Sequence, residues 1–452
     1  MTTLSGLDFV LIFLYFAILL AVGYATSRKQ NNEDYLIAQR KLGSLSTMAT
    51  VNASKTGSIL MLFVAMVYML GFSAIWYFVG MTLGILLFLP FSMRLKESSQ
   101  GRFYTLADYF KYNYGKYAAM AASLMTIFLM FGLAVLNLIA ATKIFVFFSQ
   151  WPFWICALLI MIVILIYLLL GGFKAVVKTD IIQYIAIIFI LGILAFIVFN
   201  NSSISPSEWN LFQADTASIV GFFILGILFP FSMPELWQRV YSAENKKALK
   251  NGLLSSAAIY FVFALFLAIV AVGIKTQFPD IDPDLALIHG FKELLPSGIL
   301  GLSVVMLFSA IMSSIDTYIF TGASAAVQDF STSNKEKIVK FIKIGITIFA
   351  IAGTVLSILI QSLMIGGYIF ISFAIILSVI SFATWIKKNI RESSLLYGFG
   401  FGTIGVVIFL VISLMNGEVN PAIIMVGLFA SILGLIVGGS VSKLKGIISS
   451  GT

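Results

Sequence analysis

The chain has very few charged residues, one cysteine and one histidine. Only 10% of its 452 residues are Asp, Glu, Lys or Arg, whereas soluble proteins carry roughly 25%. This shortage excludes a cytosolic enzyme, a nucleic-acid-binding protein and a disordered chain. The lone Cys156 excludes a disulfide framework and a CxxC metal site, and the lone His289 removes the usual imidazole chemistry. Because no nucleophile–base pair can be assembled either, we expect no enzymatic activity.

Hydrophobic residues dominate the chain instead: they make up 60% of it, and the mean hydropathy is +1.05. Apolar runs of roughly 20 residues, the length that crosses a bilayer, recur along the whole sequence. They do not alternate with a period of two, which excludes a porin-like barrel. We therefore expect an all-α integral membrane protein with about 13 transmembrane helices. The expected spans are Leu7–Thr26, Ser46–Tyr68, Phe72–Met93, Tyr117–Phe147, Phe153–Leu170, Thr179–Phe199, Ser218–Tyr241, Gly252–Lys275, Leu300–Gln328, Lys340–Ile360, Tyr368–Ile386, Leu396–Met415 and Ile423–Val441.

The distribution of basic residues predicts the orientation of these helices. With thirteen spans, all but four of the 28 Lys and Arg residues fall on one side, and basic loops favour the cytoplasmic side. The exceptions are Lys55, Lys143, Lys275 and Lys292. Lys143 and Lys275 lie near outer helix ends, where snorkelling explains them. We expect the N-terminus outside, the C-terminus inside, and a multi-pass protein of the inner (plasma) membrane; the net charge of +9 then reflects topology rather than a nucleic-acid partner.

Two of the expected spans contain polar and helix-breaking residues at mid-membrane depth. Residues Ala49–Ser58 read ATVNASKTGS, and residues Phe229–Arg239 read FPFSMPELWQR. Unwound backbone inside a bilayer is tolerated where it lines a cavity or is packed in protein. Four spans separate the two breaks, which favours an inverted-repeat transporter whose site lies between broken helices. Simple kinks in two packed helices are the alternative interpretation.

A third polar stretch lies in the ninth span, where Ser309–Thr317 reads SAIMSSIDT. Hydroxyl groups alone often serve to join helices, but a carboxylate at this depth, Asp316, is expensive and usually functional. Hydroxyls, freed carbonyls and a carboxylate together are hard oxygen ligands that suit an alkali cation. Asp180, near the inner end of the sixth span, has two interpretations: an N-cap of Thr179–Phe199 or a direct role with the ion.

Four motifs carry a resemblance to a known family. Asp34–Gly43 reads DYLIAQRKLG, and Gly171–Gln183 reads GGFKAVVKTDIIQ, which resembles the signature GG-x-x-AV-x-x-TD-x-x-Q. Pro234–Arg239, followed by Ser242 and Ala243, resembles a P-x-x-x-x-R segment, and Met312–Thr317 resembles an MS[ST]-x-[DS]-[ST] run. In this order the motifs resemble those of the sodium:solute symporter family, whose members include proline, pantothenate, sialic acid and sugar transporters.

The resemblance implies a leucine-transporter-like fold with a five-plus-five inverted repeat. It divides this chain into an extra helix and loop (residues 1–41), a first repeat (42–200), a second repeat (201–390) and two C-terminal helices (391–452). It also implies a secondary active transporter that moves a small organic solute with sodium by alternating access. The implied partners are that solute and the lipid bilayer, and the oligomeric state is left open.

The resemblance also implies positions for sodium and solute. The general sodium site would use the carbonyl groups of Ala53, Thr56 and Ala310 with the hydroxyl groups of Ser313 and Ser314. A second sodium site of some members would correspond to Asp180, Ser313, Asp316 and Thr317. The expected solute-facing residues are Lys55, Thr56, Ser58, Trp76, Asn137, Phe231, Ser232 and Glu235.

Lys55 departs from the family pattern, because this position usually carries a polar or acidic residue. An ammonium group at mid-membrane must lose its proton, find an acid such as Glu235, or meet an anionic ligand. A solute carboxylate favours an amino acid or another small carboxylate as the solute. The alternatives are proton-coupled or sodium-independent transport with Lys55 replacing a cation, or a transport-inactive solute sensor. The absence of a signalling domain from the sequence disfavours the sensor, and the absence of a repeated filter sequence disfavours a channel.

Overall fold

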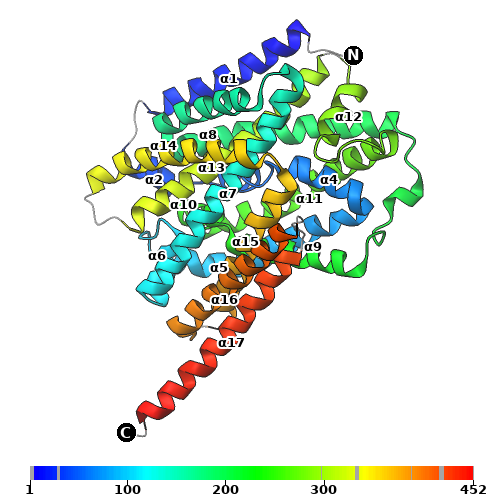
Figure 1. The fold of residues 1–452 in the computed structure, drawn as a ribbon. Helices are drawn as coiled ribbons and strands as arrows, with labels where there is room; N and C mark the ends of the chain where they lie inside the picture. Colours follow the sequence, from blue (N-terminus) through cyan, green and yellow to red (C-terminus); the bar gives the residue numbers. More distant parts are fainter. Residues whose placement is uncertain are drawn as a thin grey trace.

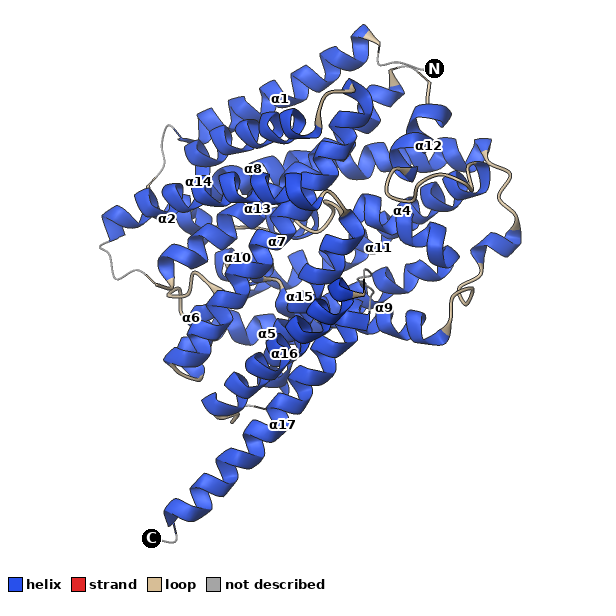
Figure 2. Ribbon diagram, viewed as in Figure 1, coloured by secondary structure: helices blue, strands red, loops and turns tan. Residues whose placement is uncertain are grey.

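The computed structural model describes residues 5–27, 31–296, 298–330, 335–387, 389–416 and 422–450. In these ranges the chain forms helices and no β-strand, which confirms the all-α expectation (Figure 2). The helices, labelled in Figure 1, are α1 (Gly6–Ser27), α2 (Asn32–Ile37), η1 (Ala38–Arg40), α3 (Ser44–Ala53), α4 (Ile59–Leu70), η2 (Gly71–Ala74), α5 (Ile75–Ser99), α6 (Leu106–Asn113), α7 (Lys116–Ser149), α8 (Phe153–Asn201), η3 (Pro206–Trp209), α9 (Thr216–Leu228), η4 (Phe229–Ser232), α10 (Pro234–Ser242), α11 (Lys246–Gln277), α12 (Ala286–Leu294), α13 (Ile299–Gln328), α14 (Lys335–Ile360), α15 (Leu363–Ile386), α16 (Glu392–Met415) and α17 (Ala422–Ser450).

Ten helical segments in the described ranges are long and apolar enough to cross a membrane. The bent pair Thr216–Ser232 and Pro234–Ser242 adds an eleventh if it is counted as one span. Two of the ten segments, Ile59–Ser99 and Phe153–Asn201, contain 41 and 49 residues. At 1.5 Å per residue they would be about 60 and about 75 Å long, at least twice the ~30 Å hydrocarbon core. The membrane-spanning helical fold is therefore confirmed, while the number of thirteen crossings and the sides of the termini stay predictions.

Both expected breaks occur in the structure. The first lies between the end of α3 at Ala53 and the start of α4 at Ile59. The second is a 48° bend between η4 and α10, centred on Met233. Proline explains the second break, because Pro230 and Pro234 occupy the first turns of η4 and α10 and lack the amide hydrogen that a continuous helix would need.

The long helix α8 changes direction at Gly172, whose φ of 54° and ψ of −152° are not helical. This backbone conformation suits glycine, since it carries no Cβ. A side chain there would also overlap the ring of Tyr35, which packs against the kink. The kink separates the expected fifth and sixth spans, which form two helical segments that meet at Gly172.

Helix α13 lies in the middle of the molecule and contacts α7, α8, α14 and α1 (Figure 1). The most apolar 18-residue window of α13 is 89% buried, compared with 17% for α1 and 28% for α16. Helices α16 and α17 pack mainly on each other and on α15, and they extend to one side of the molecule (Figure 1). The most polar spanning helix is therefore the one most enclosed by protein.

Glycines allow α5 and the broken helix α9 to approach each other closely. Gly80 and Gly84 on α5 are four residues apart, the spacing of a small-xxx-small contact. They face the backbone of Phe223 and Ile227 on α9, and Gly226 of α9 faces the backbone of α5. The backbones thus touch directly, and this contact holds α9, the first half of the second broken helix, in place.

Replacing Gly226 with Ala should destabilise the protein. Its new Cβ would overlap the carbonyl oxygen of Tyr77 and the amide nitrogen of Met81, and overpacking of this kind typically costs roughly 1–3 kcal/mol. Gly221→Ala on the same helix is the matched control, because no heavy atom lies within 4 Å of its new Cβ. We expect a lower melting temperature in detergent for Gly226→Ala than for Gly221→Ala; equal melting temperatures would contradict the close contact.

Candidate functional site

The candidate site lies where the first break meets α13. The Ser313 hydroxyl is within hydrogen-bond distance of the carbonyl oxygens of Ala53 (3.0 Å) and Ala310 (2.8 Å). The Ser314 hydroxyl lies 3.4 Å from the Ala53 oxygen, 3.2 Å from the Ala310 oxygen and 3.2 Å from the Ser54 oxygen. All five residues are buried. The structure thus brings together four of the five residues expected at the general sodium site.

The fifth expected residue, Thr56, lies next to the same oxygen atoms. Its hydroxyl donates to the Ala53 carbonyl at 2.9 Å, and its backbone amide does so at 3.2 Å. A hydroxyl has two lone pairs and a proton that can rotate. The cluster can therefore turn several oxygen lone pairs toward one point, which is the chemistry that a hard cation requires.

Side chains from α7 and α13 satisfy the backbone groups that the break exposes. Ser314 accepts from the amide of Gly57 at 3.1 Å, and Asn137 accepts from the amide of Ser58 at 2.7 Å. The hydroxyl of Tyr318 donates to the Ser54 carbonyl at 2.7 Å. A side chain at position 57 would overlap both Asn137 and Ser314, so glycine is needed there. Sequence reasoning missed Tyr318, whose position one helical turn after Ser314 was the available signal.

Lys55 and Glu235 occupy the two breaks and are both buried, with exposed fractions of 6% and 0%. In the part of the chain that the structure describes, neither the Lys55 ammonium nor either Glu235 carboxylate oxygen has a hydrogen-bond partner. The negative charge of Glu235 attracts the Lys55 ammonium group, and the positive charge of Arg239 repels it. The salt bridge considered from the sequence is therefore not formed at contact distance.

Helix ends explain how the two charges are tolerated. Lys55 follows the C-cap of α3, Ser54, where the helix dipole favours a positive charge. Glu235 lies in the first turn of α10, where the dipole favours a negative charge. The two half-helices thus stabilise opposite charges on the two sides of the site.

Three expected solute residues remain. Phe231 and Ser232 lie in η4 at the second break, and Trp76 lies at the start of α5. Phe231 packs against the rings of Phe88, Phe91, Phe382 and Trp385. The Ser232 hydroxyl donates to the Phe229 carbonyl at 2.8 Å and so remains within its own turn. Trp76 makes its contacts elsewhere: its indole nitrogen donates to the Leu211 carbonyl at 2.9 Å, and its ring packs on Phe212 and Phe223.

A second polar cluster is built around Arg239, which the sequence analysis had noted only as part of a motif. Arg239 forms a buried ion pair with Asp180 at 3.3 Å. It also donates to the hydroxyls of Thr317 (2.9 Å) and Thr50 (3.1 Å) and to the Glu235 carbonyl (3.1 Å). The arginine therefore ties α10 to α3, α8 and α13. Its three partners on the other helices lie between 59 and 189 residues away in sequence, so only the tertiary structure identifies them.

Asp180 is not a helix cap. It lies inside α8, eight residues after the kink at Gly172, and its carboxylate accepts from Thr50 and Arg239. The N-cap interpretation was wrong because the helical segment that contains Asp180 begins directly after Gly172 and not at Thr179.

Asp316 completes the second cluster. One of its carboxylate oxygens accepts from the Tyr167 hydroxyl at 2.8 Å. Its other oxygen and the second oxygen of Asp180 have no hydrogen-bond partner in the described ranges. The guanidinium group of Arg239 pairs directly with Asp180, whereas Asp316 bonds to a neutral hydroxyl group, and an uncompensated buried charge is unfavourable. The cluster has the excess of negative charge and the free oxygen atoms that a small cation would complement.

Lys143, which was expected to snorkel near an outer helix end, forms an ion pair. Lys143 on α7 pairs with Asp284 at 2.7 Å, so it does not simply snorkel. Asp284 precedes α12, the short helix that contains His289. The Tyr68 hydroxyl donates to the Phe278 carbonyl at 2.8 Å and joins this segment to α4.

Comparison with known proteins gives consistent results. The family model described as sodium:solute symporter family matches residues 35–398. The sodium/proline symporter 2 of Staphylococcus saprophyticus is 24% identical over 357 residues, covering 72% of this chain and 68% of that protein. A sodium/proline symporter of Staphylococcus aureus (strain Newman) is 24% identical over 353 residues, covering 71% and 68%.

Two solved structures share the fold. A Na+-coupled sialic acid symporter in a substrate-bound outward-open state has a TM-score of 0.77 at 19% identity, covering 96% of this chain and 98% of that one. A nucleobase-cation-symport-1 family transporter in a closed conformation has a TM-score of 0.58 at 11% identity, covering 91% and 94%. The matched family and these relatives are transporters, not enzymes. The match over residues 35–398 means that the chain belongs to the sodium:solute symporter family.

Proposed function

We propose that the protein is a secondary active transporter that couples the movement of a small organic solute to sodium. The observation that carries the proposal is the oxygen cluster of Ala53, Ala310, Ser313 and Ser314 at the first break. This cluster joins a broken helix to the most enclosed helix of the molecule, so a cation bound there would link the two mechanically. The sodium-dependent relatives support the same coupling ion.

The proposed topology has thirteen crossings, with the N-terminus outside and the C-terminus inside the plasma membrane. It counts α3–α4 and α9–α10 as one broken span each and divides α8 at Gly172. Residues 42–200 and 201–390 then form two five-helix repeats, each of which begins with a broken span. The concentration of basic residues on one side of this arrangement supports the orientation.

In this proposal, transport proceeds by rocking of the broken helices against their neighbours. Arg239 holds α10 against α3, α8 and α13 on the predicted inner side. Lys143 and Asp284 hold α7 against the segment before α12 on the predicted outer side. A cation and a solute that bind between these contacts would shift the balance between them through their different affinities for the two states.

Lys55 leads us to propose a small carboxylate or an amino acid as the solute. Its buried ammonium group has no hydrogen-bond partner among the described residues, and a solute carboxylate would supply one. The same observation supports a second candidate, in which Lys55 acts as a tethered cation and the transport is proton-coupled or sodium-independent.

The Ser314→Ala variant tests the proposed sodium site. Loss of one buried ligand hydroxyl costs roughly 1–3 kcal/mol, or about 5- to 150-fold in affinity. We expect the sodium concentration for half-maximal uptake in proteoliposomes to rise at least about tenfold. Ser303→Ala is the matched control, because Ser303 is equally buried on α13 but bonds within its own turn. Unchanged wild-type uptake when choline or potassium replaces sodium across a range of pH would refute the proposal.

Asp180→Asn tests the second cluster. The amide can still accept the hydrogen bonds from Thr50 and Arg239 but removes one of the two negative charges. We expect normal expression and a weakened dependence of uptake on sodium. Asp329→Asn is the control, since Asp329 is a carboxylate at the end of α13 that binds Ser123 and Thr105 instead. If uptake kinetics of Asp180→Asn match the wild type, Asp180 has no role in the cation path.

Lys55→Met tests the proposed solute class. Uptake of anionic and of neutral solutes should be measured side by side in proteoliposomes. We expect a selective loss of anionic solute, because methionine keeps the apolar stem but removes the charge. An equal loss of both classes that is rescued by also introducing Glu235→Gln would show instead that the two residues serve only to balance each other's charge.

A further inference from the structure

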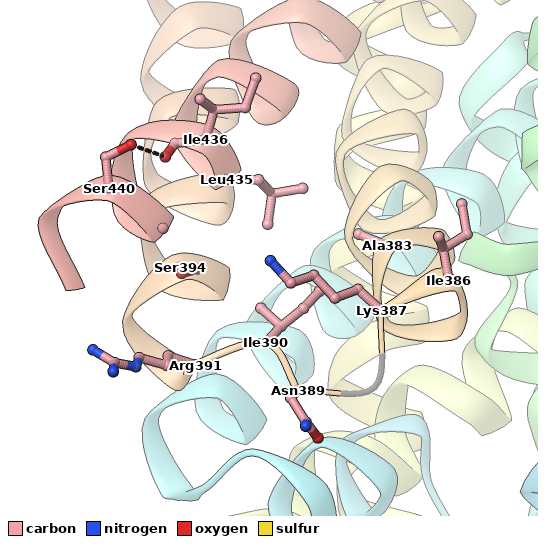
Figure 3. A pocket seen from close by; sticks show the side chains of 11 residues that line it. Ala383, Ile386, Lys387, Asn389, Ile390, Arg391, Ser394, Leu435, Ile436 and Ser440 are labelled. Atoms are coloured by element: carbon pink, nitrogen blue, oxygen red, sulfur yellow. Dashed lines mark hydrogen bonds between the residues drawn. The ribbon is translucent and has the colours of Figure 1, made fainter. Parts of the chain in front are cut away.

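A cavity lies at one end of the C-terminal helices, away from the site described above. It has a volume of about 540 Å³, within the usual range of ligand pockets. The end of α15, the start of α16 and the middle of α17 (residues 435–440) surround it (Figure 3). Its apolar wall consists of Ala383, Ile386, Ile390, Leu435 and Ile436.

Two basic side chains line the same cavity, Lys387 and Arg391. Lys387 extends into the space toward Leu435 and Ser394, whereas Arg391 points to the outer edge (Figure 3). No hydrogen bond or ion pair holds the Lys387 ammonium group in the described part of the chain. The cavity therefore combines an apolar wall with positive charge at its rim.

The acidic residue next to Arg391 in the sequence is bound to the start of α7. Glu392, the first residue of α16, accepts hydrogen bonds from the backbone amides of Tyr117 (2.7 Å) and Ala118 (2.9 Å). Its carboxylate is thus engaged with the start of α7. The start of α16 has no side-chain cap, so the positive end of its dipole adds to the field of Lys387 and Arg391.

We propose that this cavity binds an anionic phospholipid. The phosphate group would lie near Lys387, Arg391 and the start of α16, and an acyl chain would cover Ile386, Ile390, Leu435 and Ile436. Basic pockets between helix ends at the headgroup level are suited to anionic lipids. Ile386 and Ile436 are 68% and 62% exposed, so the apolar wall continues onto the lipid-facing surface. This continuity favours a lipid over a soluble phosphate compound.

A second cavity differs from the first in having no charged lining residues. It has a volume of about 830 Å³ and lies between α7, α14, α15 and α16, and no charged side chain lines it. Acyl chains can fill such a groove regardless of their headgroup. Charge selectivity is expected at the cavity beside Lys387 and not at this one.

The bound lipid would join α15, which packs on α7 and η4, to the two helices that follow it. Helices α16 and α17 pack mainly on each other and on α15. A headgroup held by Lys387 and Arg391, with a chain against Leu435 and Ile436, would connect all three. Anionic lipid should therefore raise the thermal stability of the protein.

The test uses the full-length protein purified in detergent, with added dioleoyl phosphatidylglycerol as the probe and dioleoyl phosphatidylcholine as the neutral reference. We expect the melting temperature of the wild type to rise with the anionic lipid more than with the neutral one. The double variant Lys387→Gln and Arg391→Gln should need a roughly 30-fold higher concentration of anionic lipid for the same shift. The matched control, Lys337→Gln with Lys340→Gln, removes two exposed charges from the start of α14 and should respond like the wild type.

Native mass spectrometry of the wild type, with both lipids present in equal amounts, gives an independent measurement that needs no variant. We expect preferential retention of phosphatidylglycerol. The proposal is overturned if neither lipid is preferred, if the pocket and control variants respond alike, or if soluble glycerol 3-phosphate reproduces the shift.

Discussion

The structure depends on the need to satisfy backbone groups that a broken helix exposes inside a bilayer, where water cannot do so. Between Ala53 and Ile59 the chain has no regular helix. Ser314 and Asn137 accept from its amides, and Tyr318 donates to one of its carbonyls. The Ser314 hydroxyl belongs both to this set and to the candidate cation site, because it also lies within hydrogen-bond distance of the Ala53 and Ala310 carbonyl oxygens. One side chain thus stabilises the break and contributes to the proposed ion site.

Buried charge is the second constraint, and the two polar clusters stabilise their charges in different ways. At the first, Lys55 and Glu235 have no hydrogen-bond partners in the described ranges but lie at favourable helix ends. At the second, Asp180 and Arg239 form a direct ion pair with hydroxyl groups around it. The backbone carbonyl of Glu235 accepts from Arg239, so the short helix α10 connects the two clusters. The two clusters are thus separated by a single turn of helix.

Close backbone contact explains why these polar groups remain in place. The glycines of α5 and α9 allow the second broken helix to lie directly against its neighbour, and Gly57 allows α13 and α7 to reach the first break. The polar helix α13 is enclosed by other helices, whereas α1, α16 and α17 have large exposed apolar surfaces. Polarity is concentrated where protein replaces lipid as the surrounding medium.

Much of this could be predicted from the sequence, because apolar runs, proline and glycine act locally. The helical membrane fold, both breaks and the hydroxyl cluster on the ninth span follow from residue types at fixed spacing, and four motifs indicate the family. Ser313 and Ser314 were predicted to face Ala53, and the structure brings them together. Trp76 was placed at the site by general layout alone, and its contacts lie elsewhere.

What the sequence by itself determined is the class of the protein, the positions of the breaks and the chemical type of the proposed cation ligands. The partners of its buried charges were decided only by the tertiary structure. Arg239 meets Asp180 across 59 residues and Thr50 across 189, and Asp180 lies inside a helical segment because that segment begins directly after Gly172. The physical reason is that periodicity specifies which way a residue faces on its own helix, whereas a salt bridge depends on how several helices pack against one another.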